Sequence, residues 1–168
     1  MVILEVIWDD NRTKSSYWLD SGAHFRSFFS TIWNRLEHRQ WGSRFPVTMN
    51  KLFPGDVDVS EIDAFAAELK VIQEEFRQLP VYELTWNYEQ PDACPPDGMQ
   101  FDAPVRTCED FFCHYNGIDL FHALWGCVKD VKYHGTSVHV KSSFDGPLPQ
   151  MFYDVVQAKS KQMQERRK

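Results

Sequence analysis

One amphipathic helix in the middle of the chain constrains the fold most strongly. Large apolar residues recur there at intervals of three and four positions, the spacing of a helix with one buried stripe: Ile62, Phe65, Leu69, Ile72 and Phe76. Ser60 and Asp63 resemble a capping box at the start, and Pro80 marks the end. The opposite face carries acids that we interpret as a solvated surface, Glu61, Glu68, Glu74 and Glu75. The pattern is too short for a free coiled coil, so we expect this helix to pack onto a sheet.

Extended segments are predicted on both sides of this helix. Residues 2–8 and 14–19 alternate between apolar and polar side chains and are joined by a polar turn, which indicates a hairpin at the edge of a sheet. Residues 81–88 alternate in the same way, and 137–141 form another short strand. A further short extended piece is expected near 45–52.

Two more core helices complete the predicted architecture. One runs from Asp20 or Ser21 to about Arg39, with Gly42 placed to end it, and the other runs from about Ile118 to Tyr133. We therefore predict an α+β (or α/β) fold with a single mixed, largely antiparallel sheet and about four helices packed mainly on one face.

The chain length fits one domain. Its 168 residues can bury a sizeable core, and an aromatic content of 15% excludes global disorder. We expect a single globular domain over residues 1–148, followed by an amphipathic C-terminal helix with a basic tail over 149–168. Between Gln90 and Arg106 the chain is rich in proline and acids, which predicts a long loop, and loops of this length are often functional.

Charge is distributed unevenly along the chain. The formal net charge is −6, and because residues 159–168 carry +4, the remainder carries −10. Two segments, 54–75 and 83–110, each carry −6. The acidic charge of residues 1–158 opposes non-specific binding to phosphate backbones, so a nucleic-acid-binding function is disfavoured.

The cysteines and the N-terminal segment indicate a reducing compartment. The first ten residues do not form a secretory leader and no run is long enough to span a membrane, so we expect a cytoplasmic protein with reduced thiols. Cys108, Cys113, His122 and Cys127 have the residue types of a zinc site, but their spacing does not favour one. We therefore predict neither metal nor cofactor.

The segment Gly42, Ser43, Arg44, Phe45 and Pro46, followed by the acidic helix that ends at Pro80, resembles a family of bacterial immunity proteins from polymorphic-toxin and contact-dependent inhibition systems, the family catalogued as immunity protein seventy. The stretches Asn116–Leu120 and Ser137–Val140 are similar to its C-terminal half in order and spacing. The resemblance covers about residues 1–141. It implies a non-enzymatic protein that binds and neutralises the C-terminal domain of a cognate toxin.

The Gly42–Pro46 run also has a structural interpretation. Gly42 would stop a helix, Arg44 would pair with a carboxylate, Phe45 would lie in the core and Pro46 would enter a strand. We favour this interpretation of the motif over direct contact with a partner.

The acidic segments are the candidate partner surface. A long irregular acidic loop with aromatic residues nearby would steer and hold a basic toxin such as a nuclease. The candidate contact residues are Asp92, Asp97, Asp102, Glu109 and Asp110 in and after the loop, and Asp56, Asp58 and Glu61 before the central helix.

Two other function classes stay open. One is a small hydrolase or transferase that uses Cys113, His114 or His122 with Asp119, although the chain contains no recognised catalytic motif. The other is a homo-oligomeric interaction module built on residues 149–168.

Overall fold

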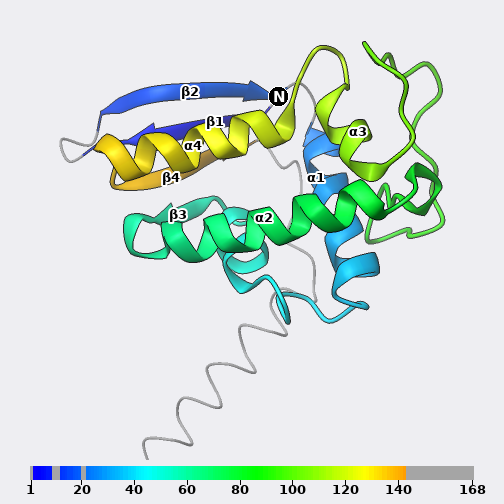
Figure 1. Cartoon of the computed structure of the whole chain (residues 1–168), viewed down its shortest axis with the longest axis horizontal. Helices are drawn as coiled ribbons and strands as arrows, with labels where there is room; N and C mark the ends of the chain where they lie inside the picture. Colours follow the sequence, from blue (N-terminus) through cyan, green and yellow to red (C-terminus); the bar gives the residue numbers. More distant parts are fainter. Residues whose placement is uncertain (1, 9–11, 20–21, 143–168) are drawn as a thin grey trace, which may run out of the picture.

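The computed structural model describes residues 2–8, 12–19 and 22–142 (Figure 1). Its strands form one sheet in the order β2-β1-β4-β3, with bounds β2 (Thr13–Leu19), β1 (Val2–Ile7), β4 (Ser137–Ser142) and β3 (Asp56–Asp58). All three pairings between these strands are antiparallel. The fold is α+β as predicted, and this sheet is antiparallel rather than mixed. The helix predicted over 149–168 lies outside the described residues.

The sheet buries one face against helices. Val2, Leu4 and Val6 of β1 are fully buried and alternate with less buried neighbours, which follows from the two-residue period of a strand. The hairpin β1-β2 is confirmed, and β4 pairs with the other side of β1. Helix α4 (Leu120–His134) lies across this sheet, and α2 (Ile62–Gln78) runs beside it (Figure 1).

Aromatic rings join the helices into one core. Helix α1 (Gly22–Thr31) continues into a π-helical turn (Ile32–Leu36), and the short α3 (Cys108–Cys113) packs near the end of α2. Phe28 of α1 meets Phe76 of α2, Phe112 of α3 and Phe121 of α4 edge to face, at ring-centroid distances of 5.5 to 5.8 Å. Such edge-to-face pairs add to the stabilisation from buried area.

The central helix is confirmed, but its cap differs from the prediction. All five apolar residues of the predicted stripe are buried. The capping box is formed by Asp58 and Glu61 ahead of a 3-10 turn (Val59–Glu61), not by Ser60 and Asp63. The Asp58 side chain accepts from Ser60 N at 2.9 Å, and Asp58 N donates to Glu61 at 3.3 Å. The helical segment therefore begins two residues earlier than predicted.

Two predicted extended segments are wrong. Near 45–52 the chain is helical, with Pro46 as its first helical residue and a π-helical turn at Thr48–Leu52. Proline suits the first helical position because its missing N–H would be unpaired there. The Glu68 carboxylate accepts from Val47 N at 3.0 Å and Thr48 N at 2.7 Å, so it satisfies the free donors at this helix start.

The strand predicted at 81–88 is also absent. A 3-10 turn (Val81–Glu83) is followed by a segment that runs along α1. Side chains of α1 satisfy its backbone: Thr85 N donates to Thr31 Oγ1 at 3.1 Å, and Tyr88 N donates to Ser30 Oγ at 3.1 Å. These bonds take the place of the backbone hydrogen bonds of a sheet. A pattern of alternating side chains does not show which kind of bond the backbone forms.

Candidate functional site

The predicted acidic loop is confirmed as a long irregular segment. Residues 84–106 contain no helix or regular strand, and they lie beyond α3 at the end of α2 (Figure 1). Both ends of the loop are fixed, because Thr85 bonds to α1 and Pro80 bridges Thr107. A further bridge joins Phe101 to Tyr115. The loop is therefore held at several points rather than only at its ends.

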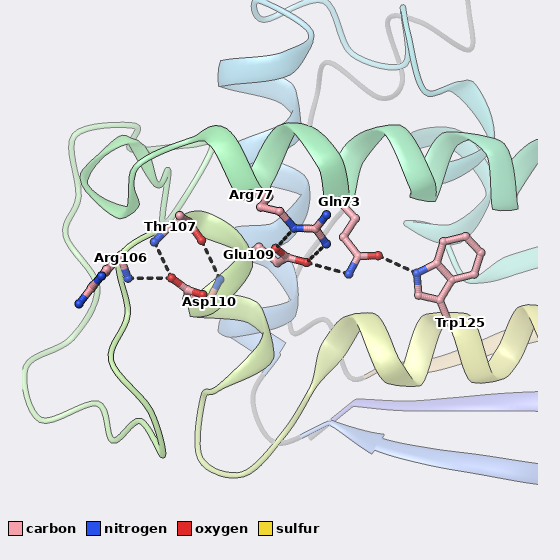
Figure 2. Close-up of polar contacts among 7 residues, drawn as sticks. All are labelled: Gln73, Arg77, Arg106, Thr107, Glu109, Asp110 and Trp125. Atoms are coloured by element: carbon pink, nitrogen blue, oxygen red, sulfur yellow. Dashed lines mark hydrogen bonds and ion pairs between the residues drawn. The ribbon is translucent and has the colours of Figure 1, made fainter.

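Glu109 is committed to the fold. Its carboxylate accepts two hydrogen bonds of 2.7 Å from the Arg77 guanidinium and one of 2.9 Å from Gln73 Nε2, and Gln73 Oε1 accepts from Trp125 Nε1 at 2.8 Å (Figure 2). These residues join α2, α3 and α4. The Arg77 hydrogen bonds lower the pKa of Glu109. Its side chain is only 14% exposed, so little of it can reach a partner.

Asp110 is also used locally. It forms a capping box at the start of α3, in which its carboxylate accepts from Arg106 N and Thr107 N, each at 2.9 Å, and Asp110 N donates to Thr107 Oγ1 at 3.1 Å (Figure 2). Burial raises the pKa of Asp110, but these donors outweigh it, so that the pKa is lowered. The Thr107-x-x-Asp110 spacing could have predicted α3, which sequence reasoning missed.

The other three loop acids remain exposed. Asp102 lies 3.0 Å from His114 Nδ1 and is 54% exposed. Asp92 and Asp97 are exposed, and neither forms a hydrogen bond or ion pair with another residue of the described chain. The five predicted loop candidates thus divide into two that hold the fold and three that face solvent.

The acids before α2 lie elsewhere and do not join the loop. Asp58 and Glu61 form the cap of the central helix, and Lys51 Nζ lies 3.2 Å from Glu61. Asp56 sits on β3 with its carboxylate 4.0 Å from His139 Nδ1. Hydrogen bonds from Ser60 lower the pKa of Asp58, as expected of a capping carboxylate.

The Gly42–Pro46 turn is organised by a buried carboxylate. Glu37 is 2% exposed, and its oxygens accept from Gly42 N at 2.7 Å, Phe45 N at 3.0 Å and Arg44 N at 3.1 Å. Burial raises the pKa of Glu37, and these three donors oppose that shift. Gly42 does not cap the preceding helix directly, because the helical turn ends at Leu36; instead it occupies a left-handed turn (φ +67°).

Arg44 links this turn to the central helix. Its guanidinium donates to Leu36 O at 2.8 Å and to Glu75 Oε2 at 3.0 Å, and it lies over the Phe45 ring. Phe45 is buried, and Pro46 begins a helix rather than the predicted strand. Two acids predicted to be solvated, Glu68 and Glu75, are thus bonded to the 44–48 segment.

Comparison with protein families then identifies the chain. A family model described as immunity protein 70 matches residues 13–140. The chain belongs to this family. Comparison with curated proteins and with solved structures gives no match. The match covers the Gly42–Pro46 turn and the whole acidic loop, in agreement with the resemblance seen in the sequence.

Three thiols of this immunity protein 70 family member, Cys108, Cys113 and Cys127, are buried or half-buried and poorly suited to nucleophilic chemistry. Burial, together with the nearby Asp119 carboxylate, raises the pKa of Cys113 to about 12. A reactive cysteine needs a lowered pKa, and His114 is paired with Asp102 instead. Among the described residues no group of three His, Cys, Asp or Glu side chains could hold a metal ion, and no helix there is long and apolar enough to cross a membrane.

Sequence reasoning missed one exposed aromatic beside the loop. Tyr82 is 81% exposed, although the strand predicted at 81–88 counted it among the alternating apolar residues. Its neighbour Glu83 pairs with Arg35 at 3.0 Å. Because the backbone here is irregular, the sequence has no periodic pattern that predicts which side chains are exposed.

Proposed function

We propose that this member of the immunity protein 70 family binds the C-terminal domain of a cognate toxin in the cytoplasm and neutralises it by covering its surface. The toxin would belong to a polymorphic-toxin or contact-dependent inhibition system and would present a basic surface, as a nuclease does. The chain itself would perform no chemistry.

One observation carries this proposal. Most acids near the loop and the central helix have internal partners, whereas Asp92 and Asp97 have none among the described residues and stand on an exposed loop. Unpaired charges on a fixed loop contribute little to the fold. They do raise the rate of encounter with an oppositely charged protein.

The test uses the C-terminal domain of a candidate cognate toxin, chosen from the reading frames that neighbour this one. The double variant Asp92→Lys, Asp97→Lys should fold normally, associate with that domain at least about tenfold more slowly at low salt, and protect cells less well. The control is Asp63→Lys, Glu74→Lys on the exposed face of α2, which changes the net charge equally. Because it also removes the 2.7 Å ion pair of Asp63 with Lys132, its stability is measured alongside that of the loop variant. Failure of the wild-type chain to bind the domain or to protect cells would refute the proposal.

A further inference from the structure

A groove lies between the Val81–Glu83 turn and the loop that follows it. Two adjoining hollows of about 450 and 370 Å³ open there, and they share Val81, Pro95 and Phe111. Other walls come from apolar residues of the loop and its flanks, Leu84, Pro91, Met99, Phe101 and Val105. The surface is therefore a shallow groove in which apolar side chains lie beside polar groups, a combination that a protein partner can contact.

The part of the groove wall formed by Val81, Phe101 and Phe111 is fixed by the fold. Phe111 of α3 contacts the rings of Phe101 and Trp86, at centroid distances of 5.4 and 6.4 Å. Val81 N donates to Arg106 O at 3.0 Å, which joins the two sides. A surface that is already ordered loses little conformational entropy on binding, so its contacts contribute more to affinity.

Tyr82 stands on the lip of the groove. Among the large hydrophobic side chains that are exposed in the described chain, it has the highest exposed fraction, 81%, and it lines one of the hollows. Tyrosine combines a large apolar ring with a polar hydroxyl and is enriched among residues that dominate binding energy. We therefore expect Tyr82 to contribute most to the affinity of a partner that binds this surface.

The charges around the groove indicate the chemistry of the partner. Asp92 lines one hollow and Asp97 the other, and neither is neutralised by a described residue. Arg35 also reaches the first hollow, but its guanidinium is paired with Glu83 at 3.0 Å. Among the residues that line the two hollows, the charges left unpaired are therefore negative, which favours lysine or arginine in the segment that occupies the groove.

We propose that this groove receives a segment of the cognate toxin domain that carries an exposed apolar side chain flanked by lysine or arginine. The apolar side chain enters between Val81 and Phe111, Tyr82 packs against it, and the flanking cations face Asp92 and Asp97. This inference rests on the proposed function and names the surface and the partner chemistry for it.

Cys94 provides a native probe of the groove. It is exposed and lines the first hollow, whereas Cys108 and Cys127 are buried and burial raises the pKa of Cys113 to about 12. Iodoacetamide at pH 8 should therefore alkylate Cys94 first. In the complex with the toxin domain, alkylation of Cys94, followed by mass spectrometry, should slow by at least about tenfold. If the complex forms but Cys94 is alkylated at the same rate as in the free chain, the groove is not the binding surface, whereas the proposed function still holds.

Two tyrosine variants test whether Tyr82 contacts the toxin specifically, or whether the loss of any exposed tyrosine weakens binding. Tyr82→Ala should weaken toxin binding at least about tenfold, whereas Tyr133→Ala, at a tyrosine of α4 that is 71% exposed, should not change it. Both variants should unfold at the wild-type denaturant concentration. Equal affinity of the two variants would contradict the groove, and absence of any complex with the wild-type chain would refute the proposed function and the groove with it.

Discussion

Two charged turns of this molecule use their polar groups in opposite ways. In the Gly42–Pro46 turn, the Glu37 carboxylate is surrounded by three backbone donors and Arg44 is bound to Glu75. In the 84–106 loop, Asp92 and Asp97 have no partner within the described chain. Both segments contain glycine, proline and charge, so composition alone does not distinguish them. The difference lies in whether a polar group is satisfied internally, and that decides which surface is available to a partner.

The largest expected effect is on the buried carboxylate of the first turn. Glu37→Ala leaves three buried or half-buried N–H groups without their acceptor, and each such group costs about 1 to 3 kcal/mol. The free energy of unfolding in urea should fall by about 3 kcal/mol or more. Glu37→Gln, which keeps one carbonyl oxygen, should lose less. A loss within 0.5 kcal/mol, the usual range for surface substitutions, would show that this turn is not held by Glu37.

A glycine pair compares the two turns directly. Gly42→Ala places a side chain in the left-handed region and against the Asn50 amide, so it should lower the free energy of unfolding by about 2 kcal/mol or more. Gly98→Ala in the loop also has a positive φ, +82°, but its added Cβ meets nothing within 4 Å. It should cost about 1 kcal/mol. Equal costs in urea titrations would contradict the packing described for Gly42.

The pH dependence of stability checks the role of Glu109. The Arg77 hydrogen bonds lower its pKa, so its contribution is complete above the ordinary value of 4.5 and is lost as the pH falls through the lowered pKa. The difference in unfolding free energy between wild type and Glu109→Gln should be constant from about pH 7 to 5 and shrink below about pH 4. It should be smaller than the Gly42→Ala effect. A difference that grows on acidification would contradict the ion pair.

The smallest effect on stability belongs to the loop acids. Asp92→Lys, Asp97→Lys should change the free energy of unfolding by less than about 0.5 kcal/mol, because neither carboxylate has a described partner. The same variant should show the slowed toxin association described above. A clear destabilisation would mean that these charges belong to the fold after all.

Long periodic elements were predictable from the sequence, and segments whose backbone is bonded by side chains distant in sequence were not. The stripe of α2, the hairpin and α4 follow from periods of 3.6 and 2. The 45–52 and 81–88 segments failed because Glu68 and Thr31 bond to their backbones from about 20 and 54 positions away. No local pattern contains such a contact.

The candidate site was predicted in part. The position of the acidic loop is correct, and Asp92, Asp97 and Asp102 are exposed in it. Glu109 could not be separated from them by charge, because its partner Arg77 lies on α2 and reaches it only once α2 and α3 pack together. Asp110 could have been separated, because the local Thr107-x-x-Asp110 spacing is that of a capping box. Whether the exposed acids contact a toxin stays a prediction.

Hydrogen–deuterium exchange of the free chain and of its complex with the neighbouring toxin domain tests the central claim most directly. Within 91–99, Pro91, Pro95 and Pro96 have no amide hydrogen, and Ala93 N donates to Gln90 O. The other amides of this segment have no hydrogen bond in the described chain and should exchange fast in the free chain. Binding should slow exchange over residues 81–101 and leave the Gly42–Pro46 turn unchanged. Protection confined to the Gly42–Pro46 turn, with unchanged exchange across the loop, would contradict the account.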